Sequence, residues 1–304
     1  MPSPGTALLL AAGHGTRLRP LTARRAKPAL PVAGSSLIER SLAWLVRSGV
    51  HEAVVNLHYR PETVAGLLGD GTGHALRIRY SWEQPLLGSA GGPRRAFALV
   101  DEDALWLVNA DTIAEVELAA MAAWHDASGA LVTMAVIANP DPARYGGVLV
   151  DEAGAVTGFT PRGAPGPSWH FVGVQLARRA AFASLPDGRP AESVADLYPA
   201  LIARQPGCVS AYRTAVSFHD IGTPADYLSA CLTLAGSDPG ALAAPDVRVA
   251  ADAVVDRSVL WEDVVVGPGA RLTDCVVMDG ARVPAGFSAR RAVVAPDLSL
   301  TPIA

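Results

Sequence analysis

Short apolar runs alternate with amphipathic helical stripes along residues 1–235, and this alternation is the feature that most constrains the fold. The run Ala7–Ala11 has the length and composition of a buried parallel strand, and the first helical stripe begins at a capping box, Ser36–Glu39. Strands that alternate with helices form βαβ units and a mostly parallel sheet. Residues 147–156 depart from the alternation as a predicted hairpin, so we expect a mixed sheet.

The remaining elements of this region continue the same alternation. We predict further strands at 53–57, 77–80, 105–108, 130–138 and 171–176, and helices at 61–68, 91–100, 117–127, 194–204 and 224–234. Together these elements predict an α/β fold class.

The C-terminal residues follow a different pattern. After a linker at 236–245, large apolar residues recur about every six positions from Val249 to Val283. This resembles the hexapeptide repeat of a short left-handed parallel β-helix, with two or three coils of about 18 residues. So short a solenoid has little core of its own, and we expect it to pack on other protein surface. We therefore predict an α/β domain at 1–236 and a linker plus β-helix at 237–304.

Composition excludes several classes of protein. Apolar residues make up 50% of the 304, and a net charge of −4 gives no argument for nucleic-acid or membrane partners. No apolar run reaches the ~18 residues of a membrane span, and the first residues lack the charged segment of a signal peptide. Cys208, Cys231 and Cys275 suit neither a disulfide framework nor a zinc site. We therefore expect a cytoplasmic globular protein.

One lysine stands out among the basic residues. Of the 25 Lys and Arg residues, 24 are Arg and only Lys27 is Lys. Under such a bias, a lysine is expected to persist where a compact ammonium is needed and the wide guanidinium fork fails. We interpret Lys27 as a functional residue.

Lys27 follows a glycine-rich loop that begins at the end of the first predicted strand. Residues 10–22 read LAAGHGTRLRPLT, and four residues separate this segment from Lys27. Gly13 and Gly15 let a phosphate approach the backbone N–H groups closely, and Arg17 carries the fork that binds phosphate oxygens. The loop is therefore a candidate phosphate-binding site.

Two better-known phosphate loops do not fit this segment. A P-loop and a dinucleotide-binding loop both require a glycine at the position that Leu18 occupies. A kinase-like or NAD-binding function therefore has little support.

The loop resembles the signature of the sugar-1-phosphate nucleotidylyltransferases, also called NDP-sugar pyrophosphorylases. Their pattern L-A-[AG]-G-x-G-T-R-L-x-P-L-T-x(4)-K-P is matched without a gap at residues 10–28. Three later segments are also similar: Glu83–Gly92 to the family's E-x-x-L-G-T-A-G loop, Val108–Asp111 to its N-G-D, and His219–Pro224 to its W-x-D-[IV]-G-T-P. The resemblance implies a Rossmann-like nucleotidyltransferase fold of the GT-A type, followed by the short β-helix.

The resemblance also implies which residues hold the nucleotide. The implied nucleotide-binding residues, in chain order, are Ala11, Ala12, Gly13, Gly15, Thr16, Arg17, Glu83, Gly88 and Ser89. The first three would line the base and ribose, the next three the triphosphate, and the last three the base. Arg17 and Lys27 are the implied catalytic residues. Arg19, Arg24 and Arg25 match no motif position, and we interpret them as solvated surface residues.

Metal and sugar contacts are implied in the same way. Asp111 and Asp220 would bind Mg²⁺, and Gly146 and Gly173 would contact the sugar. The segment Thr160-Pro-Arg162 stands where many members have E-K-P, and we expect Arg162 to take the place of that lysine. This departure concerns the identity of the sugar and not the reaction.

The implied reaction joins a nucleoside triphosphate to a sugar 1-phosphate and releases pyrophosphate. The attacking phosphate monoester has a second pKa of about 6, so it needs no general base at neutral pH. Bringing two polyanions together is the difficulty, and positioning and charge neutralisation should dominate catalysis. Arg17, Lys27 and Mg²⁺ supply that neutralisation.

Several functions remain open at this point. GTP and mannose 1-phosphate are the expected substrates. The alternatives are a uridylyltransferase for an amino-sugar 1-phosphate and a guanylyltransferase for a heptose 1-phosphate. A non-catalytic NDP-sugar sensor is disfavoured because Arg17, Lys27, Asp111 and Asp220 are all present, and a hexapeptide acyltransferase is disfavoured because no histidine follows His219. The tail is expected to mediate assembly into a homo-oligomer.

Overall fold

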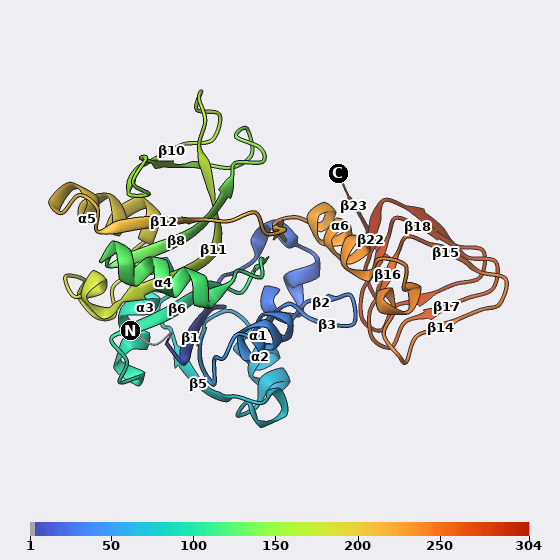
Figure 1. Ribbon diagram of the computed structural model, residues 1–304. Helices are drawn as coiled ribbons and strands as arrows, with labels where there is room; N and C mark the ends of the chain where they lie inside the picture. The colour runs from blue at the N-terminus through green and yellow to red at the C-terminus, as the bar shows by residue number, and fades with distance from the viewer. Residues whose placement is uncertain (1–3, 304) are drawn as a thin grey trace. The chain divides into compact units, whose positions relative to one another are not determined.

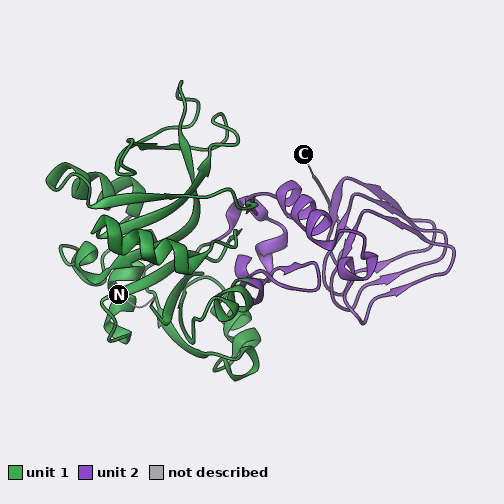
Figure 2. Cartoon of the chain, in the orientation of Figure 1, with its two compact units in different colours: residues 1–13, 41–218 green, residues 14–40, 219–304 purple. Residues whose placement is uncertain are grey.

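The computed structural model describes residues 4–303, which form two compact units (Figures 1 and 2). Unit 1 holds the chain up to residue 13 together with residues 41–218, and unit 2 holds residues 14–40 together with the chain from residue 219. The glycine-rich loop therefore changes unit after Gly13. The second half of the loop belongs to the same unit as the C-terminal residues. The boundaries of these units differ in kind from the predicted division between residues 236 and 237, which stays a prediction.

Unit 1 is built on a nine-stranded mixed sheet. Its strands are β1 (Thr6–Leu10), β4 (Glu52–Leu57), β5 (Arg77–Trp82), β6 (Ala104–Asn109), β8 (Val132–Ala138), β9 (Gly147–Val150), β10 (Val156–Thr160), β11 (Trp169–Arg178) and β12 (Val209–Arg213). Seven of them follow the order β10-β9-β11-β6-β1-β4-β5, and β8 pairs with β11 and β12. β1 is parallel to β4 and β6, whereas β11 is antiparallel to β6, β8 and β9. The predicted α/β class and mixed sheet are confirmed.

Helices pack on the strands of unit 1 (Figure 1). They are α2 (Pro61–Leu68), α3 (Gly88–Ala96), α4 (Leu118–Ser128) and α5 (Tyr198–Arg204), with short helical turns at Thr72–His74, Phe97–Leu99, Arg179–Phe182 and Ser193–Leu197. α3 contacts β1, β4 and β5, whereas α4 contacts β8, β11 and β12. Tyr198 and Leu201 of α5 share one buried apolar cluster with Leu8 and Leu107 of the sheet. The apolar runs are thus strands because both their faces are covered.

The hairpin predicted at 147–156 forms as the antiparallel strands β9 and β10. β12 is an element that the sequence analysis did not predict, although it pairs in parallel with β8. Its five residues, VSAYR, carry no clear period-two pattern, and its pairing depends on residues more than 70 positions away. No helix among residues 4–303 is long and apolar enough to cross a membrane.

Unit 2 begins with short elements around the glycine-rich loop. They are the 3₁₀ turns η1 (Thr16–Leu18), η2 (Leu21–Ala23) and η3 (Lys27–Ala29) and the strands β2 (Pro31–Val32) and β3 (Ser35–Ser36). Helix α1 (Leu37–Arg47) starts here and continues into unit 1. Its predicted capping box is confirmed, since Glu39 Oε2 accepts from the Ser36 backbone N–H at 2.8 Å and the Glu39 N–H donates to Ser36 Oγ at 3.3 Å.

The strand β13 (His219–Asp220) and helix α6 (Pro224–Ala235) follow in unit 2. In unit 1, the short strand β7 (Thr112–Ile113) directly follows Asp111, the other predicted metal ligand. α6 starts at a second capping box, in which Thr223 and Asp226 bond reciprocally. Both predicted metal ligands therefore lie at or beside a very short strand.

The C-terminal part of unit 2 is a solenoid of three parallel coils. Its strands are β14 (Arg248–Val249), β15 (Val254–Asp256), β16 (Val259–Leu260), β17 (Val265–Val266), β18 (Arg271–Thr273), β19 (Val276–Val277), β20 (Arg282–Val283), β21 (Ser288–Arg290), β22 (Ala292–Val294) and β23 (Leu300–Pro302), with a 3₁₀ turn, η8 (Pro239–Leu242), before them. Each of three sheets stacks one strand from every coil, and β23 adds an antiparallel strand to one of them.

The register of the solenoid explains why its repeat deviates from six. Val249, Val266 and Val283 stack directly, which gives a coil of 17 residues where 18 were expected. One side of each coil is a residue shorter, and its corner residues, Arg257 and Asp274 among them, have a positive φ. Val266 and Val283 belong to a buried aliphatic cluster inside the coils, whereas Val249 on the first coil is exposed.

Candidate active site

Gly15 shapes the phosphate loop in unit 2. It has φ +60°, and a Cβ placed on it would lie 2.9 Å from Thr22 Cγ2 and 3.3 Å from Lys27 Cβ. Thr22 Oγ1 donates to the Gly15 carbonyl at 2.8 Å. Only glycine fits this backbone conformation and this space without strain. The loop is therefore packed against the segment that carries Lys27, and Thr16 and Arg17 on its next turn are exposed.

Lys27 is largely buried, with 7% of its surface exposed. It begins η3, and its carbonyl accepts from the Leu30 N–H at 3.1 Å. Pro28 lies within this turn and Pro31 follows it, and each proline ring restricts the backbone. A buried lysine held on a stiff turn fits the interpretation of Lys27 as a residue with one fixed task.

Gly222 lies beside two of the residues with predicted roles. A Cβ placed on it would lie 3.1 Å from Asp220 Oδ2 and 3.3 Å from Arg17 Nη1. The structure thus brings together Arg17, predicted to bind phosphate, and Asp220, predicted to bind metal. The sequence analysis used Gly222 only as part of a motif and missed that a side chain here would crowd both groups. His219 is half-buried, and burial lowers its pKa.

Arg25 is not the solvated surface residue that the sequence analysis assigned. Its guanidinium donates to both carboxylate oxygens of Glu262, at 3.1 and 2.7 Å, and to both of Asp279, at 3.1 and 2.5 Å. It also lies over the ring of buried Trp261, with 5.3 Å from Cζ to the centroid. Burial raises the pKa of Asp279 to about 6, and its hydrogen bond with Glu262 adds to the rise. We call this group the Arg25 clamp.

A buried polar network supports the loop at Glu83–Gly92 in unit 1. Asn56, at the end of β4, accepts from the Ala11 N–H at 2.6 Å and donates to Glu83 Oε1 at 2.7 Å. Glu83 Oε2 accepts from the Leu87 N–H at 2.8 Å. Glu83 and Asn56 are each only 3% exposed, and burial raises the pKa of Glu83. Both carboxylate oxygens thus bond within the protein, which gives Glu83 a supporting role, while its direct contact with a base stays a prediction.

Asn56 was missed by the sequence analysis. Its signal is a lone amide in the apolar run AVVNL, where an unpaired polar group would be costly. Through it, Ala11 in the glycine-rich loop and Glu83 in the later loop are fastened to one side chain.

Gly88 and Ser89 begin helix α3 against a segment far along the chain. A Cβ on Gly88, which has φ +75°, would lie 2.5 Å from Glu192 Oε1. Ser89 Oγ donates to Glu192 Oε2 at 2.6 Å and accepts from the Ser193 N–H at 2.8 Å. Glu192 is a further residue that no motif indicated. It fixes the loop where the two predicted base contacts lie.

Asp111 follows β6 and is flanked by the predicted sugar contact Gly173. Gly173 has φ +85° at an irregularity in β11, and a Cβ on it would lie 2.6 Å from Thr112 Oγ1 and 2.9 Å from Asn109 Cβ. The structure therefore places Gly173 against the Asn109–Thr112 segment. Ala110, which stands at the glycine position of the family's N-G-D motif, is fully buried.

The other predicted sugar contacts, Gly146 and Arg162, lie next to the β9–β10 hairpin. A Cβ on Gly146 would lie 3.0 Å from the Thr160 carbonyl, and Arg162 is exposed on the loop that follows. Aromatic rings gather beside Gly146, with Tyr145 and His170 centroids 4.3 Å apart and His170 and Phe218 centroids 4.8 Å apart. The sequence analysis did not identify these rings.

The donors of Asp111 and Asp220 fit a hard cation. Each carboxylate is partly exposed, and magnesium prefers carboxylate oxygens with water and phosphate completing its shell. Among residues 4–303, no three His, Cys, Asp or Glu side chains gather to hold a metal ion. The binding of Mg²⁺ by Asp111 and Asp220 stays a prediction.

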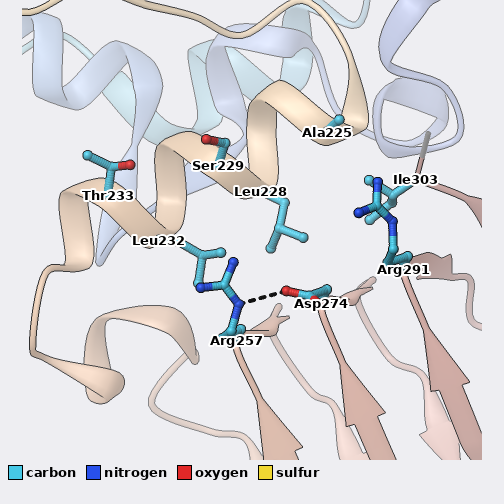
Figure 3. A pocket seen from close by; sticks show the side chains of 9 residues that line it. All are labelled: Ala225, Leu228, Ser229, Leu232, Thr233, Arg257, Asp274, Arg291 and Ile303. Atoms are coloured by element: carbon cyan, nitrogen blue, oxygen red, sulfur yellow. Dashed lines mark hydrogen bonds and ion pairs between the residues drawn. The ribbon is translucent and has the colours of Figure 1, made fainter.

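A separate hollow of about 450 Å³ lies in unit 2 between α6 and the corners of the coils (Figure 3). The Arg257–Asp274 ion pair, with Nε 2.8 Å from Oδ1, lies on the side of the hollow that the coils form. Its lining residues are Ala225, Leu228, Ser229, Leu232, Thr233, Arg257, Asp274, Arg291 and Ile303.

The chain belongs to the nucleotidyl transferase family, whose model matches residues 6–236. A GlmU-like C-terminal hexapeptide model matches residues 229–300, in agreement with the predicted left-handed β-helix. Mannose-1-phosphate guanylyltransferase of Mycobacterium tuberculosis is 29% identical over 297 residues, which cover 92% of this chain and 81% of that protein. The resemblance found in the motifs is confirmed, and the protein is an enzyme of the nucleotidyltransferase class.

Other similar proteins carry different names. N-acetylmuramate alpha-1-phosphate uridylyltransferase of Caulobacter vibrioides is 40% identical over 145 residues, 47% of this chain and 55% of that protein. The crystal structure of HddC from Yersinia pseudotuberculosis superposes with a TM-score of 0.67 at 22% identity, covering 75% of this chain and 99% of that one. The structural likeness supports the nucleotidyltransferase fold.

Proposed function

We propose that the protein transfers GMP from GTP to mannose 1-phosphate, giving GDP-mannose and pyrophosphate. The observation that carries this proposal is the alignment with the M. tuberculosis guanylyltransferase, which extends through both the nucleotidyltransferase and the solenoid sequences. The nucleotidyl transferase model matches residues 6–236, and this range contains the glycine-rich loop, Lys27 and both predicted metal ligands.

The proposed reaction is a single displacement at the α-phosphorus of GTP. A phosphate oxygen of the sugar phosphate forms the new P–O bond, the bond to the bridging oxygen of the β-phosphate breaks, and pyrophosphate leaves. Backbone N–H groups at Gly15 and Thr16 would hold the triphosphate, and Arg17 and Lys27 would neutralise its charge. Asp111 and Asp220 would hold Mg²⁺, which when bound adds further neutralisation of the phosphates. No side chain needs to act as a nucleophile or base.

A second candidate is transfer of UMP to an amino-sugar 1-phosphate. The observation that favours it is the higher identity, 40%, with the C. vibrioides uridylyltransferase over 145 residues. That match covers less than half of this chain, so we place it second. A heptose 1-phosphate is the third acceptor to test.

The first experiment measures pyrophosphate release for GTP, UTP, dTTP, ATP and CTP, each with mannose, glucose, amino-sugar and heptose 1-phosphates. We expect the highest kcat/KM for GTP with mannose 1-phosphate, and loss of turnover when EDTA removes Mg²⁺. A preference for UTP with an amino-sugar phosphate would replace the first candidate by the second. Silence across the panel from folded protein would contradict catalysis of this reaction class.

We also propose that the solenoid mediates self-association. Val249 and Val254 on its first coil are 45% and 44% exposed, and β14 and β15 lie at the edges of their sheets. Exposed aliphatic side chains on an edge strand favour pairing with another chain. We expect light scattering to give a multiple of the monomer mass, and V249K/V254K to give the monomer. A monomeric wild-type protein at all concentrations would contradict the proposal.

A further inference from the structure

The Arg25 clamp fastens the segment that carries Lys27 to the solenoid. Arg25 lies two residues before Lys27, whereas Glu262 and Asp279 lie on successive coils, 237 and 254 positions away. All four residues belong to unit 2. The Arg25 side chain is only 22% exposed, and its guanidinium makes four hydrogen bonds to two carboxylates. A planar fork held in this way has little freedom to move.

The same segment is fastened on the other side of Lys27. The Tyr227 hydroxyl of α6 donates to the Pro31 carbonyl and accepts from Trp261 Nε1 at 2.8 Å. Trp261 is also the ring beneath Arg25. Burial raises the pKa of Tyr227 well above its ordinary value, so the hydroxyl keeps its proton and can donate. Residues 25–31 are therefore tied at both ends to a single aromatic and ionic group.

We propose that Arg25 is a positioning residue: Glu262 and Asp279 of the solenoid hold it and thereby fix the Lys27 ammonium for catalysis. The proposal rests on the role of Lys27 in the proposed function. It gives the solenoid a part in the reaction, because two of its coils supply the carboxylates. A lysine side chain has four rotatable bonds, and fixing its turn of backbone reduces the entropy lost when it meets the phosphates.

The composition of the chain offers a direct readout of this position. Lys27 is the only lysine, so an amine-selective acylating reagent labels this side chain and the terminal α-amine, which serves as the internal reference. Peptide mass spectrometry then gives the labelling rate of Lys27 without any substrate. We expect R25M to raise that rate about tenfold, and to lower kcat about tenfold with little change in KM, since a misplaced group costs rate more than ground-state binding.

Variants of the solenoid test whether Arg25 acts through the carboxylates. E262Q/D279N is expected to reproduce the effects of R25M on both labelling and kcat. The triple variant R25M/E262Q/D279N should show no larger effect, because the three residues act as one unit. This variant carries no unpaired carboxylates, so it separates loss of the clamp from repulsion between Glu262 and Asp279. Thermal unfolding identifies any variant that fails to fold.

The matched control is R257M, which breaks the Arg257–Asp274 ion pair on the same solenoid. It should leave both the labelling of Lys27 and kcat unchanged. The proposal is overturned when all clamp variants label at the wild-type rate, or when R25M lowers kcat while E262Q/D279N does not. Because labelling needs no turnover, a wild-type protein without activity but with the expected labelling changes would contradict the proposed function and leave the clamp intact.

Discussion

Replacing Lys27 with alanine is expected to lower kcat/KM by about 10²–10³-fold, the usual loss when one preorganised charged donor is removed from a developing negative charge. The ammonium is the one compact cation available on this loop, and its side chain is 7% exposed. Pyrophosphate release at saturating and limiting substrate separates kcat from KM. The defect should fall mainly on kcat, because the proposed contact strengthens as the new P–O bond forms.

Lys27→Arg makes this prediction sharper. The charge is kept, but the guanidinium is larger, and Lys27 Cβ already lies 3.3 Å from the point where a Cβ would sit on Gly15. We expect K27R to retain no more than about a tenth of the activity, because the wide fork cannot replace a point charge in a packed turn. R24A, at an exposed position of the same loop, is the control and should be fully active. Wild-type activity in K27A would refute the catalytic role.

The sequence predicted the features that depend on neighbours along the chain. Both capping-box residues of α1, the hairpin of β9 and β10 and the stacked aliphatic residues of the solenoid follow from local periodicity and turn chemistry. The glycine-rich loop was identified in the same way, because its glycines and Lys27 lie within 15 residues of one another.

The features that escaped prediction join residues far apart in the chain. Arg25 was interpreted as surface because no motif position covers it, yet its partner Asp279 lies 254 positions away. Glu192 bonds to Ser89 across 103 positions, and Asn56 bonds to Glu83 across 27. A sequence shows which residues are charged or polar, but tertiary packing decides which partner each polar group meets. The sequence alone therefore does not show whether a polar residue supports the fold or contacts a ligand.

Glu83 is a residue for which a supporting role and a ligand contact make different predictions. E83A is expected to lower the free energy of unfolding by about 3 kcal/mol, because it removes the acceptor of two buried donors and leaves a cavity. Those donors are Asn56 Nδ2, at 2.7 Å, and the Leu87 N–H, at 2.8 Å. Urea unfolding followed by tryptophan fluorescence measures the change. An unchanged stability together with a raised KM for the nucleotide would instead establish Glu83 as a direct base contact.

Glu83→Gln is the matched variant, since it keeps the shape and removes the charge. The NH₂ group of the glutamine then faces the N–H of either Asn56 or Leu87, which is also a donor. If the Asn56 amide rotated so that its oxygen accepted from the glutamine, it would lose the hydrogen bond from the Ala11 N–H, which is 2.6 Å long. We expect the free energy of unfolding of E83Q to be about 1–2 kcal/mol lower than that of the wild type at low pH.

The pH dependence of stability gives a second check on Glu83. Burial raises the pKa of Glu83, so the native state binds this proton more tightly than the unfolded chain does. The contribution of wild-type Glu83 to stability is therefore fully present below the unfolded pKa and falls as pH rises through the raised native value. The stability difference between wild type and E83Q should accordingly shrink between acid and neutral pH, and a difference that grows over this interval would show that the ionised carboxylate is the favoured native form.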